Sequence, residues 1–241
     1  MTTRRTLRLA LVSAAPTPAL RAARFPDDEG LDADGLRRTA TAARTLATGA
    51  LPGRARVLVD DSARARQTAR LLGLAARAGE AGVQIDAALR DLDVGSWRGR
   101  NLGEIPTAEL QRWHAEPAMA PPGGESREDL LARVGAWLAG LAAQSEHVIA
   151  VSHPAVVRAV LLTVLRCPPE IFWRIDVAPL TATLLHRHAL EPELAPAPNP
   201  DSASVPAPAL ALNSDSTSAV GSHPGSRPEP AWTLTHACRP L

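Results

Sequence analysis

The chain has 241 residues, of which 45% are hydrophobic and 21% are charged. These are ordinary values for a globular protein, and they exclude wholesale disorder. Its 26 basic residues, all of them arginine, nearly balance 25 acidic residues for a net charge of +1, and there is no basic block, so nucleic acid is not expected as the main ligand. The length suits one α/β domain or two very small ones, and no repeat of roughly 20 to 50 residues recurs along the chain.

The N-terminus and the two cysteines bear on cellular location. Cys167 and Cys238 are too few for a disulfide framework, and their spacing to other ligand types fits no zinc site. No apolar run approaches the roughly 18 residues of a membrane span. Arg4-Arg5 and the apolar residues after them imitate a twin-arginine export signal, but Arg8 interrupts that stretch. We therefore expect a cytoplasmic protein without metal, other cofactor or membrane partner.

In the first part of the chain, short apolar runs alternate with helical spacings. Residues 7–12 form an apolar run that predicts a buried strand, and residues 57–59 predict another. Apolar positions at helical spacing predict a helix over residues 32–46. Residues 62–74 predict a second helix, with Ser62 as its N-cap.

The alternation continues after the breaker run at 121–124. Residues 125–141 predict an amphipathic helix, residues 147–152 a strand, residues 154–165 a helix and residues 182–186 a last internal strand. Strands that alternate with helices favour an α/β fold. We expect a single domain with a parallel-rich sheet and helices on both faces.

The composition then changes abruptly. Residues 190–231 hold nine Pro and seven Ser in 42 positions, without aromatic residues or periodic apolar positions, which predicts a disordered insertion. The alternating pattern at 232–235 predicts a short edge strand that returns to the domain. The expected organisation is an α/β domain over residues 1–189, the insertion over 190–231, and the returning strand and C-terminus over 232–241.

Ligands of open α/β sheets bind beyond the carboxyl ends of the strands. Three strand-to-helix junctions are therefore the places to look for chemistry. They cover residues Leu11 to Thr17, Asp60 to Ala69 and Val148 to Pro154.

Four blocks in order resemble one family. Ser62 to Ala69 resembles S-P-L-x-R-A-x-Q-T-A, Leu89 to Gly99 resembles L-x-E-x-x-x-G-x-W-x-G, Gly123 to Ser126 is G-G-E-S, and Val151 to His153 is V-S-H. Together they resemble the histidine phosphatase superfamily, which is also called phosphoglycerate mutase-like. The resemblance covers about residues 7 to 188 and resumes at Trp232, and it implies the phosphoglycerate mutase-like fold.

The resemblance also implies a reaction. In the family a His in an R-H-G motif attacks phosphorus, two Arg and a second His bind the phosphoryl oxygens, and a Glu protonates the leaving oxygen. Carried over to this chain, Arg64 falls on the second Arg, His153 on the second His and Asp91 on the acid. The implied ligand is a small phosphorylated metabolite or inorganic phosphate.

The first motif departs from the family. Ser13-Ala14-Ala15 stands where the family has Arg-His-Gly, so the nucleophile is missing at Ala14 and a cation is missing at Ser13. Loss of a covalent nucleophile costs on the order of 10⁴ to 10⁶ in rate. Alanine here is compatible with natural loss and with an engineered change. Asp91 is also one methylene shorter than Glu, and turn formation near Gly95 is an adequate alternative explanation for it.

Three functions stay open. The first is a phosphatase with low or unconventional activity, and the second is a non-catalytic module that binds or senses a phosphate ester. The third is a hydrolase that uses Ser13 or Thr17 as nucleophile and His153 as base, which needs a hydrogen bond between them. Arg64, Ser13 and Thr17 are the expected substrate-binding residues. The loop over residues 96–122 is expected to set specificity, and the oligomeric state stays open.

Overall fold

The computed structural model describes residues 6–46, 51–142, 146–188 and 232–241. It contains a six-stranded sheet in the order β3-β2-β4-β1-β5-β6. The strands are β1 (Thr6–Ser13), β2 (Arg56–Val59), β3 (Val83–Ile85), β4 (Val148–Ser152), β5 (Thr181–His188) and β6 (Thr233–Pro240). The first four are parallel, whereas β5 runs antiparallel to β1 and β6 antiparallel to β5. The expected parallel-rich α/β sheet is confirmed, with an antiparallel pair at one edge.

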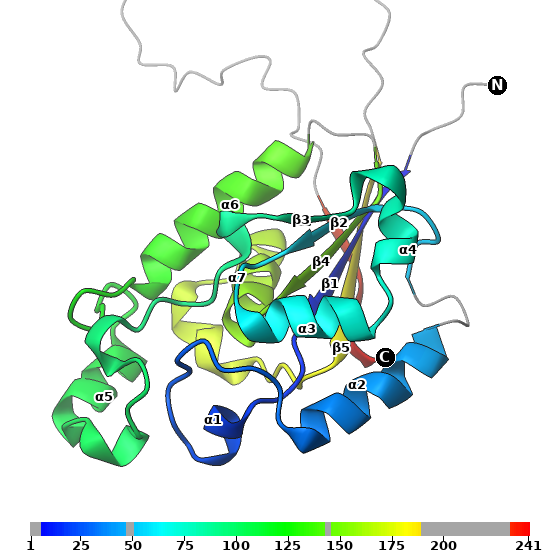
Figure 1. Ribbon diagram of the computed structural model, residues 1–241. Coiled ribbons are helices and arrows are strands. Elements are labelled where there is room, and N and C mark those ends of the chain that lie inside the picture. The colour runs from blue at the N-terminus through cyan, green and yellow to red at the C-terminus, as the bar shows by residue number, and fades with distance from the viewer. Residues whose placement is uncertain (1–5, 47–50, 143–145, 189–231) are drawn as a thin grey trace, which may run out of the picture.

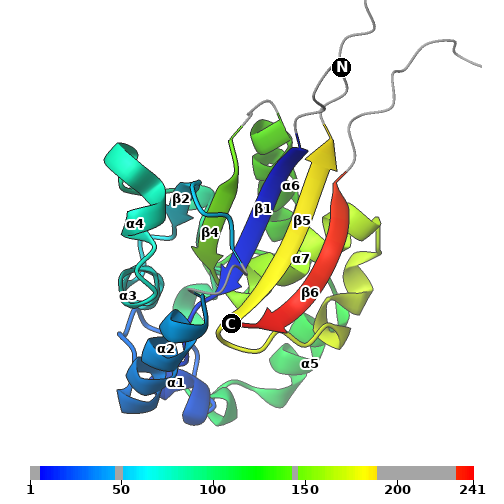
Figure 2. The ribbon, with the colours of Figure 1, turned by 90° about the vertical axis from the view of Figure 1, so that its right-hand side faces the viewer.

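Helices cover both faces of this sheet. They are α1 (Pro18–Arg21), α2 (Ala33–Leu46), α3 (Ala63–Leu71), α4 (Ala75–Ala78), α5 (Thr107–Ala115), α6 (Arg127–Ala142) and α7 (Pro154–Leu165). Short 3-10 turns add η1 (Gly79–Ala81), η2 (Ala87–Leu89), η3 (Gly95–Trp97), η4 (Leu102–Glu104) and η5 (Pro169–Arg174). In Figure 1, α6 and α7 lie on one side of the sheet and α2, α3 and α4 on the other. Figure 2 shows β5 and β6 without a helix in front of them on this second side.

The central strand β1 shows why the sequence lacks a polar and apolar alternation. Leu9 and Leu11 pack into the core cluster under α6 and α7, while Ala10 and Val12 pack into the cluster under α2 and α3. Both faces of the strand are buried, so both sets of side chains must be apolar. Because β1 and β2 both pair with β4 in parallel, the carboxyl ends of these three strands meet at one edge of the sheet.

Several elements differ from their expected bounds. The helix expected over residues 62–74 ends at Leu71, and Gly73, which has a φ of +68°, separates it from α4. Neither the short strand β3 nor α5 was expected, because three residues are too few for a pattern and α5 buries no residue. The edge strand expected at 232–235 is β6, which runs on to Pro240. The expected insertion over 190–231 lies outside the described residues.

Within the described ranges, every helix is too short or too polar to cross a bilayer.

Candidate active site

Strand register brings three junctions together. Ser13 of β1 pairs with Ser152 of the parallel neighbour β4, so the next residues along the two strands, Ala14 and His153, leave the sheet side by side. The N–H of Ala14 donates to the carbonyl of Ser152 at 2.8 Å. On the other flank of β4, parallel β2 ends one residue before Asp60. The site expected at the carboxyl edge of the sheet therefore has a geometric basis.

Helix α3 begins at this edge. Ser62 is its N-cap, with extended backbone, and its Oγ accepts the N–H of Ala65 at 3.4 Å. Arg64 follows in the first turn. One turn later, the Thr68 hydroxyl donates to the Arg64 carbonyl at 2.7 Å and accepts the N–H of Ala15 at 3.1 Å. This contact ties the loop after β1 to α3 and fixes the helix relative to the sheet.

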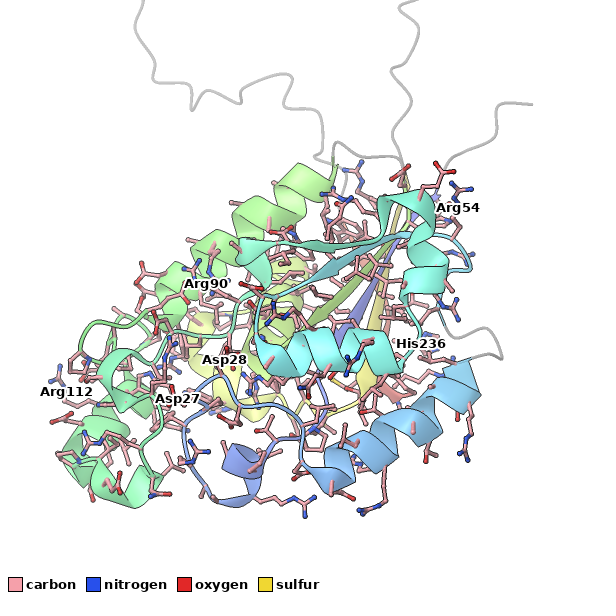
Figure 3. The ribbon with its side chains drawn as sticks, in the orientation of Figure 1. Asp27, Asp28, Arg54, Arg90, Arg112 and His236 are labelled. Atoms are coloured by element: carbon pink, nitrogen blue, oxygen red, sulfur yellow. The ribbon has the colours of Figure 1, made fainter. Side chains whose placement is uncertain are left out.

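A cavity of about 330 Å³ opens beside the β2 and β4 junctions, and its lining residues do not include those of the β1 junction. Its lining is strongly charged. Six carboxylates, three arginines and one histidine line it: Asp28, Glu29, Asp60, Asp61, Asp91, Asp93, Arg64, Arg90, Arg98 and His153. Figure 3 labels Asp28 and Arg90, which reach the cavity from the loop between α1 and α2 and from the segment after η2.

His153 lines the cavity and is buried, with 1% of its surface exposed. Its Nε2 lies 2.7 Å from an Asp60 oxygen and 3.4 Å from Ser62 Oγ. Its Nδ1 lies 3.9 Å from Asp91 Oδ2, which is beyond hydrogen-bond distance, and has no hydrogen-bond partner among the described residues. One ring nitrogen is therefore bound, and the other is buried and unsatisfied.

Arg64 and Asp91 form an ion pair in which Arg64 Nη2 donates to Asp91 Oδ2. Burial of the Asp91 carboxyl raises its pKa, but the charges of His153 and Arg64 and the N–H of Leu92 lower the pKa by more. The pKa of Asp91 therefore lies below its usual range, and the carboxyl is ionised near neutral pH. A group that must donate a proton there needs a raised pKa instead. In this geometry Asp91 acts as a counter-ion.

Two further carboxylates hold the N–H groups at the start of α3. Asp60 accepts the N–H of Ser62 at 3.2 Å, and Asp28 accepts the N–H of Ala63 at 2.8 Å. Burial raises the pKa of Asp60, but its hydrogen bonds with His153 and Ser62 outweigh burial and hold the pKa far below the usual range. Such helix-start N–H groups are a common anion-binding element. Here they already hold carboxylates.

The G-G-E-S block helps to hold the segment that carries Asp91. Glu125 is 8% exposed and receives a two-pronged contact from Arg133 at 2.9 and 2.7 Å. Arg133 Nη1 also donates to the carbonyls of Ala88 and Arg90 at 2.7 and 3.1 Å. This buried fork fixes the segment that carries Asp91.

Asp93 serves the turn that the sequence suggested. Its Oδ1 accepts the N–H of Gly95 at 3.0 Å and pairs with Arg98 at 3.2 Å. Gly95 has a φ of +51°, and a Cβ on it would lie 2.3 Å from the carbonyl of Pro122. Only glycine fits this close approach.

The structure brings some predicted residues together and leaves others apart. Arg64, His153 and Asp91 line one cavity. Ser13, Ala14 and Thr17 are not among the lining residues. The Ser13 Oγ is buried without a hydrogen-bond partner in the described part of the chain, and Thr17 donates to Glu29 at 3.1 Å. The hydrogen bond that a Ser13 or Thr17 nucleophile needs with His153 is not present.

Asp28, Asp60 and Ser62 were missed as site residues. The position of Asp60 and Ser62 just after a buried strand was a usable signal, because β2 opens on the same edge as β4. Asp28 lies in an irregular loop and carried no such signal. Within the described ranges, His, Cys, Asp and Glu side chains do not form a group of three or more suited to a metal ion.

Comparison with known proteins gives consistent results. The chain is 31% identical over 159 residues to a bifunctional protein of Mycobacterium tuberculosis, a match that covers 63% of this chain and 42% of that protein. Among solved structures, "Mycobacterial hydrolase 1" has a TM-score of 0.65 at 27% identity, covering 76% of this chain and 93% of that one. A mycobacterial glucosyl-3-phosphoglycerate phosphatase has a TM-score of 0.63 at 26% identity, covering 76% and 92%.

The family profile described as "Histidine phosphatase superfamily (branch 1)" matches residues 19–196. The matched stretch begins beyond Ser13-Ala14-Ala15 and includes the blocks at Arg64, Asp91 and His153. Because the match covers most of the chain, the protein belongs to the histidine phosphatase superfamily.

Proposed function

We propose that the protein binds a small phosphate monoester in this cavity without forming a phosphohistidine. The observation that carries the proposal is the position of Ala14, which leaves β1 beside His153. A methyl group can form no bond to phosphorus, so covalent catalysis at this position is absent.

The donors for a phosphoryl group support the binding part of the proposal. Arg64 Nη2 and His153 Nδ1 both face one oxygen of Asp91, and Nδ1 lacks a hydrogen-bond partner in the described structure. Two donors that face one carboxylate oxygen can face one phosphoryl oxygen after the carboxylate moves away. The Asp91 side chain is 31% exposed, so it has room to turn toward solvent.

The relatives support the ligand class. One structural neighbour at 26% identity is named for the phosphatase reaction on glucosyl-3-phosphoglycerate, a phosphorylated small molecule. We infer that this chain also binds a phosphorylated small molecule. We do not infer the same compound, because the cavity is lined by more carboxylates than arginines.

Calorimetry with ethyl phosphate at about pH 6 tests the proposal. The parent protein should bind, and Arg64→Ala should bind at least tenfold more weakly, because truncation removes a charged donor worth about 1.5 to 3 kcal/mol. Arg70→Ala is the matched control, since Arg70 is an exposed arginine on the same helix. Equal binding by the parent and Arg64→Ala, or no binding by the parent, would contradict the proposal.

A further inference from the structure

The charge of the cavity suits an anion poorly. It is lined by six carboxylates and three arginines. Two of the arginines are already paired with cavity carboxylates, Arg64 with Asp91 and Arg98 with Asp93. The third, Arg90, pairs with Glu125, which does not line the cavity. A phosphate monoester would therefore bring negative charge into a space that already has an excess of it.

Two carboxylates beside the start of α3 are not offset by a buried cation. Asp28 forms no ion pair with a basic side chain within the described ranges, and its side chain accepts one hydrogen bond there, from the N–H of Ala63. Asp61 pairs with Arg66, but both side chains are more than half exposed, so the pair is weak in water.

The backbone at Asp28 adds a second feature. This residue has a φ of +54°, in the left-handed region that non-glycine residues rarely adopt. The Asp28 carboxylate accepts the N–H of Ala63 at the α3 start while the residue stays exposed to solvent. Strained positions of this kind concentrate at binding sites.

An independent feature of the same cavity points to an anionic ligand. His153 lines the cavity, and its Nδ1 atom is buried and has no hydrogen-bond partner among the described residues. Together with Arg64, it calls for an acceptor from a ligand. The cavity thus offers the donors of Arg64 and His153 to an anion, and the carboxylates of Asp28 and Asp61 to a cation.

We propose that the ligand is a zwitterion: a phosphate monoester whose phosphoryl group binds Arg64 and His153, and whose ammonium group binds Asp28 and Asp61. This inference rests on the proposed function and narrows its substrate class. The cavity volume of about 330 Å³ restricts the ligand to a small molecule. The ammonium group offsets the repulsion that the carboxylates impose on the phosphate.

Phosphoethanolamine and ethyl phosphate test the inference, because they differ by one ammonium group. Calorimetry at low salt should show phosphoethanolamine binding at least about fivefold more tightly to the parent protein. Asp28→Asn combined with Asp61→Asn should reduce this preference to less than about twofold, while ethyl phosphate binds equally well or better. Asp61→Asn alone should lower the preference part of the way, and it changes only an exposed side chain.

Glu80→Gln is the control, since Glu80 is exposed on η1 and does not line the cavity. It should keep the full preference. Equal binding of the two esters by the parent would overturn the zwitterion inference and leave the proposed function standing. A preference that survives both Asn substitutions would also overturn it. Binding of neither ester would overturn the proposed function, and this inference with it.

Discussion

Arg64 and Asp91 form an ion pair in the middle of the cavity, and the Asp91 oxygen in that pair also faces the unsatisfied Nδ1 of His153 at 3.9 Å. An internal carboxylate thus lies where the two donors of the anion site converge. The block from Leu89 to Gly99 implied an acid role for Asp91, but its lowered pKa and its ion pair fit a counter-ion better. Any anion that binds Arg64 must compete with Asp91.

Removal of that competition should strengthen anion binding. We expect Asp91→Asn to bind inorganic phosphate about five- to tenfold more tightly than the parent in calorimetry, because Arg64 no longer has an ionic partner to give up. Asp93→Asn is the matched comparison: it removes the same charge from the same cavity, but Asp93 pairs with Arg98. Its gain should be clearly smaller. Equal gains in the two variants would mean that general charge, and not competition for Arg64, limits binding.

The contact between Asp60 and His153 should make the free energy of unfolding depend on pH. The folded-state pKa of Asp60 lies below its usual value of 3.8. The ionised carboxylate therefore stabilises the fold above about pH 3.8, and this contribution is lost as the pH falls from there toward the folded-state pKa. Asp60→Asn should lower the free energy of unfolding by about 2 kcal/mol at pH 7.

Urea unfolding at a series of pH values measures this difference. The gap between parent and Asp60→Asn should shrink as the pH falls below about 4. A gap that stays constant down to pH 3 would show that the loss comes from packing and not from the charge.

The buried fork of Arg133 should matter far more than a similar pair at the surface. Arg133→Met leaves the Glu125 carboxylate, which is 8% exposed, without this partner, and should lower the free energy of unfolding by about 3 kcal/mol. Arg112→Met breaks the exposed pair with Glu116 and should change it by less than about 1 kcal/mol. Similar losses in urea unfolding would contradict the role assigned to the fork.

Much of the fold could be predicted because its signals are local. The apolar run before Ser13 and the helical spacing after Pro154 each reflect burial of one element, and the structure has a strand and a helix there. The antiparallel course of β5 and β6 could not be predicted, since an apolar strand pattern does not encode strand direction.

The site also has parts that could be predicted from the sequence and parts that could not. Arg64 and His153 follow buried strands at block positions of the family, and the structure brings both into one cavity. The occupation of the Arg64 guanidinium could not be predicted. It depends on Asp91, which lies 27 residues further along the chain and meets Arg64 only through tertiary contact.

The parent protein should also carry no covalent phosphate. After incubation with a reactive phosphate monoester, intact-mass spectrometry is expected to show no added phosphoryl group, because Ala14 offers no nucleophile. Acid and alkaline quenching should give the same result. A phosphoryl group on His153, or on Ser62, whose Oγ lies 3.4 Å from His153 Nε2, would identify that residue as the nucleophile and contradict this expectation.

The most direct test of the account is Ala14→His, compared with Ala14→Gln as a variant of similar size that cannot attack phosphorus. If the site is a histidine phosphatase site that lacks its nucleophile, the His variant should become phosphorylated by a reactive phosphate monoester and turn it over at least tenfold faster than the parent. The Gln variant should match the parent. A folded His variant that binds ethyl phosphate but shows neither label nor turnover would contradict the claim that Ala14 occupies the position of the missing nucleophile.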